Sequence, residues 1–220
     1  VHLLVPQRGE KKQLADLAKK NARENAVRRH ERLSRKYERT LGACKELGAA
    51  LGISAPRRIE CYDISNFQGA QSVASMVVFI DGEPAKKEYR FFKIKTVEGP
   101  NDFASMAEAI IRRFNRLKND DAAFNDRPDM ILIDGGKGQL SAAVEAVQST
   151  GYPNPPPLFG LAKQFELVYR PGESDPIVLD RRSNALHLLQ RVRDEAHRFA
   201  ITNHKNLRGK KTLHSRLEDI

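Results

Sequence analysis

The spacing of hydrophobic positions changes near residue 57. Before that point, apolar side chains recur every three or four residues, which is the spacing of one face of a helix. They are Leu33, Tyr37, Leu41, Cys44, Leu47 and Leu51. The pattern predicts one long helix or two joined helices over residues 10–52, with a thinner apolar stripe before residue 26. Ser54, Ala55 and Pro56 are expected to end it.

Residues 57–95 have the pattern of strands. Three strand-like runs cover residues 57–65, 71–82 and 85–95. Asp81 and Gly82 separate the second run from the third, and this dipeptide is a strong signal for a tight hairpin. The third run alternates, with Tyr89 and Phe91 on one face and Phe92 and Ile94 on the other. Three antiparallel strands are therefore predicted.

The rest of the chain alternates between helical and strand patterns. Helices are expected over residues 103–119, 137–148 and 182–203, and strands over residues 130–134 and 158–163, followed by a hairpin around Pro171 and Gly172. This order predicts an α/β protein with a ribonuclease H-like mixed sheet flanked by helices. The expected divisions are a basic helical segment, 1–56, packing on the domain that follows, the ribonuclease H-like domain, 57–205, and a tail, 206–220.

Composition limits the kind of protein. The 220 residues suffice for one sizeable domain with an appendage, and 40% of them are hydrophobic against 30% charged. No apolar run is long enough to span a membrane and no secretory signal opens the chain, so a cytoplasmic location is expected. Cys44 and Cys61 are too few for a disulfide framework or a zinc site, and idle buried thiols are the simpler interpretation. Because the chain begins with Val1, we expect a fragment of a longer protein.

The net charge of +10 is unevenly distributed. Residues 1–58 carry 15 Lys and Arg against 6 Asp and Glu, residues 59–180 carry 13 against 18, and residues 181–220 carry 10 against 4. Basic ends around an acidic centre suit a polyanion, because Lys and Arg release counterions from phosphates. Solvated helices with many charges would look the same, so charge alone leaves both interpretations open.

Two aspartates follow strand patterns and are candidate metal ligands. Asp134 ends the continuous apolar run Met-Ile-Leu-Ile, where a carboxylate is costly to bury unless a positive group lies opposite. Asp63 lies at the end of the first strand run. The carboxyl ends of adjacent parallel strands form the usual site of an α/β sheet. Two carboxylates there would repel each other unless a divalent cation, Mg²⁺ or Mn²⁺, compensated both.

His197 on the last predicted helix is the third candidate. An imidazole can complete a Mg²⁺ or Mn²⁺ site or carry a proton during phosphodiester hydrolysis. Arg193, four residues earlier, can share a face with His197 and suits a scissile phosphate, and Arg198 lies within a turn. Taken singly, Asp63 could be a turn residue and His197 a packed histidine. Together, the three favour metal-dependent hydrolysis.

The glycines after Asp134 invite comparison with a nucleotide-binding loop. The match is poor, because Gly138 follows Lys137 where a phosphate loop needs Ser or Thr. A tight strand-to-helix turn is the simpler interpretation, although Lys137 at the start of its helix can direct a charge toward the site. Asp102 is a secondary candidate, because as the expected N-cap residue it already has a structural role.

Four motifs in order resemble the C-terminal endonuclease half of the UvrC family. They are IECYDISNFQG, GPNDFASMAEAI, ILIDGGKGQL and RDEAHRFAITNH, within about residues 57–205. The resemblance implies a ribonuclease H-like domain that cuts DNA on the 5′ side of a bulky lesion. It also implies catalytic roles for Asp63, Asp134 and His197, and it places Asp102 in a family motif.

The same resemblance implies partners and missing parts. Damaged double-stranded DNA and UvrB would be the partners, with UvrA acting earlier in the pathway. The N-terminal nuclease domain, the UvrB-contacting segment and the helix-hairpin-helix module lie outside this chain, which is expected to be monomeric. Two alternatives stay open: a non-catalytic nucleic-acid-binding adaptor, and a ribonuclease or recombination nuclease on the same fold. Dependence on divalent ions and the choice of substrate would separate them.

Overall fold

The computed structural model describes residues 6–65, 72–97, 99–119, 121, 124, 126–163 and 166–218, with the backbone alone from residue 203 onward. The α-helices are α1 (Gly9–Tyr37), α2 (Ala43–Leu51), α3 (Asp102–Lys118), α4 (Lys137–Ser149) and α5 (Asn184–Glu218). The strands are β1 (Arg58–Ser65), β2 (Val73–Ile80), β3 (Glu83–Pro84), β4 (Arg90–Lys93), β5 (Met130–Asp134), β6 (Leu158–Ala162) and β7 (Leu167–Tyr169).

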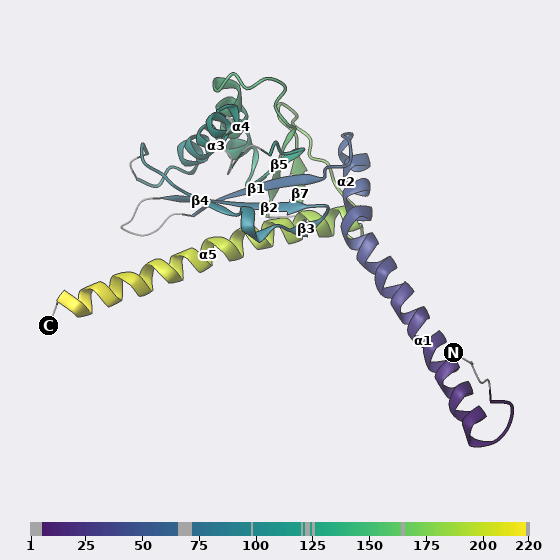
Figure 1. Ribbon diagram of the computed structural model, residues 1–220. Coiled ribbons are helices and arrows are strands. Elements are labelled where there is room, and N and C mark those ends of the chain that lie inside the picture. The colour runs from purple at the N-terminus through teal and green to yellow at the C-terminus, as the bar shows by residue number, and fades with distance from the viewer. Residues whose placement is uncertain are drawn as a thin grey trace.

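One mixed sheet forms the centre of the domain. Its order is β3-β2-β1-β5-β6-β7, and β4 also pairs with β2. β1, β5 and β6 are parallel to one another, whereas β2 is antiparallel to β1, and β7 is antiparallel to β6. Figure 1 shows α3 and α4 on one side of this sheet and α5 crossing the other side, next to α2. The predicted mixed sheet flanked by helices is confirmed.

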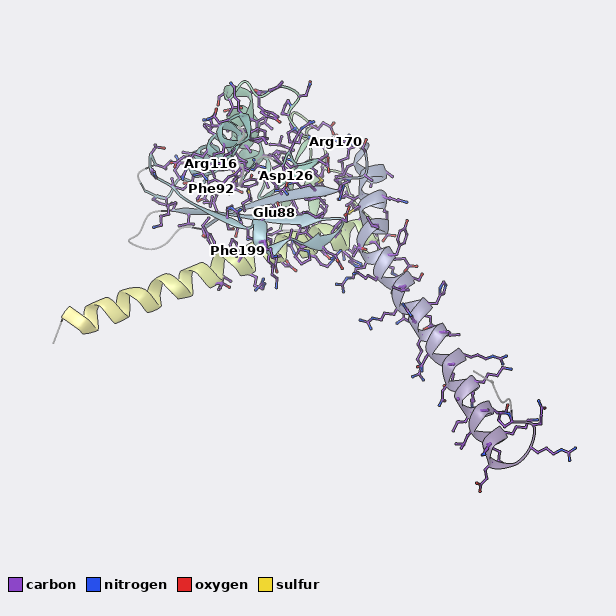
Figure 2. All side chains as sticks on the ribbon, in the orientation of Figure 1. Glu88, Phe92, Arg116, Asp126, Arg170 and Phe199 are labelled. Atoms are coloured by element: carbon purple, nitrogen blue, oxygen red, sulfur yellow. The ribbon has the colours of Figure 1, made fainter. Side chains whose placement is uncertain are left out.

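Alternation along the strands divides the core into two halves. Cys61 of β1 and Leu132 of β5 pack with α2 and α5, whereas Tyr62 and Ile133 pack with α3 and α4. Figure 2 labels Phe92, which belongs to the α3 side, and Phe199 of α5, whose ring stacks on Phe91 on the opposite side. Because successive strand residues point to opposite faces, Asp63 and Asp134 share the face that α5 covers.

The predicted hairpin after β2 forms. Asp81 and Gly82 both have positive φ, 52° and 79°, as a two-residue hairpin turn of this type requires. The third strand is shorter than predicted, because a 3₁₀ turn over Lys86–Glu88 separates β3 from β4. Pro84 lacks an N–H and cannot donate to a strand ladder, which favours this interruption.

The helical segment before the sheet is only partly packed. A π-helical turn over Glu38–Gly42 joins α1 to α2. The predicted apolar stripe is buried at Cys44, Leu47 and Leu51, as expected. The predicted burial is wrong for the other members of the stripe, because Leu33, Tyr37 and Leu41 are exposed. α2 and the π turn thus contribute buried residues to the domain, whereas α1 buries no residue and projects from it (Figures 1 and 2).

The last helix is longer than predicted. α5 begins at Asn184 and continues to Glu218 instead of ending near residue 203, so the backbone of the predicted tail is mostly helical. The hairpin expected around Gly172 is reduced to β7 and a single bridge between Val168 and Ile177. Within the described part of the chain, none of the helices combines the length and the apolar character needed to span a bilayer.

Candidate active site

Three parallel strands bring their carboxyl ends to one edge of the sheet. Tyr62 pairs with Ile133, and Asp134 pairs with Leu161, so the next residues along β1 and β6 reach the same edge. Asp63 and Asp134 therefore follow the last shared pair of β1 and β5 as neighbours, although β1 itself continues to Ser65. Lys163 directly follows β6 at this edge. Asp134 is the last residue of β5, as predicted, whereas Asp63 lies two residues before the end of β1.

Both carboxylates are buried, and burial disfavours their negatively charged forms. Asp63 is 6% exposed and Asp134 is 5% exposed. Burial, followed by repulsion from Asp134, raises the pKa of Asp63 from 3.8 to about 6. Burial also raises the pKa of Asp134, although Lys163, Arg193 and His197 oppose the shift. Both shifts mean that the negative charges are poorly compensated.

Asp134 has acceptor capacity that the protein does not use. Both of its carboxylate oxygens are buried, and neither accepts a hydrogen bond from the residues described. The Lys163 ammonium lies 3.6 Å from Asp134 Oδ2, which is an ion pair but too long for a hydrogen bond. Unsatisfied buried oxygens in a native fold require an explanation, and binding of a cation is one of the usual ones.

His197 joins the aspartates from the helix that covers them. Its Nδ1 lies 3.7 Å from Asp63 Oδ2. The preceding residue, Ala196, is fully buried, and the Ser75 hydroxyl lies 3.4 Å from the carbonyl oxygens of both Asp63 and Ala196. This polar contact fixes α5 against β1 at the level of the site, so the position of the imidazole is set by the core.

A cleft of about 340 Å³ opens beside these residues. It is lined by Asp134, Lys163, Glu166, Arg193, Asp194 and His197. Arg193 donates to Glu166 at 2.6 Å and to Asp194 at 3.0 Å, so its guanidinium is held within the cleft. Lys163 and Arg193 thus bring two positive charges next to a carboxylate pair.

Two predicted substrate-binding residues point elsewhere. Lys137 donates to the Ser174 carbonyl at 2.6 Å and lies over the Tyr169 ring, and it does not line the cleft. Arg198 is bonded to Glu195, which also accepts from Tyr89. The Arg198–Glu195 pair follows from i,i+3 spacing on the helix, whereas the contact of Lys137 with Ser174 joins segments 37 residues apart, which sequence spacing cannot show.

Asp102 differs from the prediction in its structural role. The N-cap of α3 is Asn101, whose side chain accepts from the Ala104 N–H at 3.0 Å, so the prediction of Asp102 as N-cap is wrong. Asp102 is instead the first helical residue, where a negative charge suits the helix dipole. It lines a hollow with Phe103, separate from the cleft of Asp134.

Lys163 and Glu166 are site residues that the sequence reasoning missed. The pattern over residues 158–163 predicts a strand that ends at Lys163. Its position at a strand end therefore matches that of Asp134. Glu166 gave no comparable signal. Its positive φ of 56° and its bond to Arg193 arise only in the folded turn between β6 and β7.

The residues of the site supply only part of the ligands that a hard divalent cation needs. Among the described residues, no group of three or more His, Cys, Asp or Glu side chains is arranged to hold a metal by itself. Two buried carboxylates, of which Asp134 has both oxygens unsatisfied, and one nearby imidazole are nevertheless donors that Mg²⁺ and Mn²⁺ accept, with the remaining positions filled by water and phosphate oxygens.

Comparison with known families decides the relationship. Residues 48–201 match the model of the UvrC RNAse H endonuclease domain. The chain belongs to the UvrC family. This description agrees with the mixed sheet and confirms the predicted ribonuclease H-like fold.

UvrC relatives align along nearly the whole chain. The protein named UvrABC system protein C of Desulforudis audaxviator is 48% identical over 235 residues, covering 100% of this chain and 37% of the relative. Its counterpart in Gloeobacter violaceus is 49% identical over 225 residues, covering 100% and 35%. The chain thus spans just over a third of the length of these UvrC proteins. Among solved structures, human ENDOV matches 72% of this chain and 87% of its own at 12% identity, with a TM-score of 0.41.

Proposed function

We propose that this UvrC domain hydrolyses a DNA phosphodiester on the 5′ side of a lesion, in nucleotide excision repair, with Mg²⁺ or Mn²⁺ as cofactor. The observation that carries the proposal is the pairing of Asp63 with Asp134 at neighbouring strand ends, with His197 Nδ1 3.7 Å from Asp63. Membership of a family described as an endonuclease domain supports it.

Asp63 and Asp134 would hold the metal, with His197 as a third ligand or as a proton carrier. A divalent ion bound there lowers the pKa of water and stabilises charge on phosphate oxygens. The unsatisfied oxygens of Asp134 and the raised pKa of Asp63 support this assignment, because a cation would relieve both.

The protein's own cations would position the substrate. Lys163 and Arg193 line the cleft and can contact the non-bridging oxygens of the scissile phosphate. Water attacks phosphorus, and the bond to the 3′ oxygen breaks, which leaves a 3′-hydroxyl and a 5′-phosphate. His197, exposed to the cleft, can accept the proton lost by water. Glu166 and Asp194 keep Arg193 in place through their ion pairs.

Damaged double-stranded DNA and UvrB are the proposed partners. The relatives are named as components of a UvrABC system, and the basic α1 suits contact with a polyanion. The domain itself is proposed to act as a monomer, in the cytoplasm.

Asp134→Asn tests the proposal. The amide keeps the shape of the side chain but removes the charge that binds the metal, so incision of lesion-bearing duplex with UvrB should fall roughly 1000-fold or more. Binding of the DNA should change little. Gel analysis of nicked product, over a titration of Mn²⁺, measures both the rate and its metal dependence.

Asp175→Asn is the matched control, because Asp175 is exposed and does not line the cleft. It should cut at the wild-type rate. Wild-type incision by Asp134→Asn would remove Asp134 from the mechanism and favour an adaptor role. Faster cutting of an RNA–DNA hybrid than of lesion-bearing duplex would indicate a ribonuclease instead.

A further inference from the structure

A second hollow lies next to the turn that follows Asp134. It has a volume of about 730 Å³ and is lined by residues 100–103, at the start of α3, and by Gly136, Gly138 and Gln139 at the start of α4. No residue of the cleft described above lines it. None of the proposed catalytic steps uses it.

Phe103 is the unusual side chain of this hollow. It is 53% exposed, although other apolar residues of the same helix, Met106 and Ile110, are fully buried. Its ring lies directly on the backbone of Gly138, where an added Cβ would come within 2.7 Å of the ring. A glycine at this position therefore seats an exposed aromatic ring, and the ring forms one wall of the hollow.

Chain length places this hollow near the catalytic carboxylates. Gly136 is two residues and Gly138 four residues beyond Asp134, so their Cα atoms lie within roughly 7 Å and 14 Å of it. An added Cβ at Gly136 would meet no atom within 4 Å, so the backbone there borders open space. A DNA strand with one phosphate at Asp134 would bring its adjoining nucleotides to this region.

The composition of the walls selects the kind of ligand. Phe103 supplies the one aromatic face. The rest of the wall consists of Pro100, glycine backbone and the polar side chains of Asn101, Asp102 and Gln139, and no second large apolar side chain joins them. A flat ligand with a polar edge fits such walls, since every nucleobase stacks on aromatic rings and an amide both donates and accepts hydrogen bonds. An apolar helix or a second copy of the chain would need a wider hydrophobic surface.

We propose that this hollow binds an unstacked nucleobase of the DNA strand next to the scissile phosphate, with Phe103 as the stacking surface. The inference rests on the proposed nuclease function and adds a base-binding subsite to it. Gln139 contacts the polar edge of the base. The subsite holds the strand in register with Asp63 and Asp134, so that a particular phosphate lies at the cleft.

The test uses full-length protein and lesion-bearing duplex with 2-aminopurine at successive positions around the incised phosphate. The Asp134→Asn background prevents cutting by this domain during the measurement. We expect fluorescence to rise at one or two positions on binding, because 2-aminopurine brightens when it leaves the base stack. Phe103→Ala should abolish the rise and Gly138→Ala should reduce it, whereas Phe103→Tyr should preserve it.

Incision by the otherwise wild-type protein gives a second measurement. Phe103→Ala should lower kcat/KM roughly 5- to 100-fold, mainly through KM, as expected for loss of one stacked base. Leu41→Ala, which removes an exposed apolar side chain from the π turn, should have no effect on incision or fluorescence. Thermal unfolding shows whether each variant is folded.

The outcomes separate the subsite from the nuclease function. Unchanged fluorescence and incision in Phe103→Ala would overturn the proposal. Loss of UvrB-dependent incision without any change in fluorescence would also overturn it, by assigning the hollow to a protein partner. If Asp134→Asn cuts like wild type but the Phe103-dependent signal persists, the catalytic assignment of Asp134 fails and the base-binding site stands.

Discussion

Asp63 carries a cost in stability that its chemistry explains. Burial and the neighbouring Asp134 raise its pKa from 3.8 to about 6, so the folded protein binds a proton that the unfolded chain has already released in this pH range. The contribution of Asp63 therefore lowers the free energy of unfolding as pH rises from about 4 to 6. Above that range, this contribution no longer changes. A shift of this size corresponds to about 3 kcal/mol.

Asp63→Asn should remove this part of the pH dependence. We expect the metal-free variant to be more stable than wild type at pH 7, and the difference between the two should shrink as pH falls toward 4. Urea unfolding in EDTA across this range measures the difference directly. Parallel profiles for the two proteins would show that the Asp63 carboxylate is not destabilised by its surroundings.

Single residues also show which positions can be predicted from the sequence and which cannot. Asp134 could be selected because an apolar run predicts burial, and burial makes a carboxylate conspicuous. Arg193 could be placed on the face of His197 from helical spacing alone. Lys137 could not be placed correctly, because its contact with Ser174 joins segments 37 residues apart. Whether a long side chain turns toward a site or a nearby carbonyl depends on which acceptors folding brings within reach.

The hairpin turn between β2 and β3 contacts both the π turn and α5. Gly82 faces the π turn, where an added Cβ would lie 2.7 Å from Thr40 Cα. Arg191 of α5 donates to the carbonyls of Gly82 and Arg39, at 3.1 Å and 2.5 Å, so three elements are held together here. The dipeptide Asp81-Gly82 predicted the turn, but nothing in the local sequence predicted what packs against it.

Gly82→Ala should destabilise the fold through two effects. The alanine would adopt a positive φ and would also press on the Thr40 backbone, with an expected loss of about 3 kcal/mol or more. Gly172→Ala is the matched control, because its φ is 76° but no atom lies within 4 Å of an added Cβ. It should lose only about 1 kcal/mol. Chemical denaturation distinguishes the two, and equal losses would contradict a close contact at Thr40.

At the scale of the whole molecule, the chain consists of a packed domain with two projecting helical parts (Figure 1). α2 belongs to the domain, where Arg170 of the β7 end donates to the Leu51 carbonyl at 2.7 Å. α1 buries no residue, and its last turn reaches the domain through an exposed ion pair between Lys36 and Glu83 of β3, at 3.0 Å. The same apolar spacing therefore runs from an exposed helix into a buried one.

Leu47→Ala and Leu33→Ala test this division on one predicted stripe. Leu47 is fully buried between α2 and the core, so its truncation should cost about 2 to 5 kcal/mol. Leu33 is 57% exposed, and its truncation should change stability by less than about 0.5 kcal/mol. Unfolding of the two variants side by side measures the contrast. A large loss in Leu33→Ala would mean that α1 packs on the domain in solution.

The sequence by itself determined the order of strands and helices, the hairpin turn, and the aspartates at strand ends, because these follow from local periodicity and turn chemistry. It also determined the family relationship through four motifs. Only the tertiary structure decided that α1 projects, that Lys163 and Glu166 join the cleft, and that Phe103 borders a hollow. These features depend on contacts between segments distant in the chain, and local pattern carries no information about which distant surface will cover a given side chain.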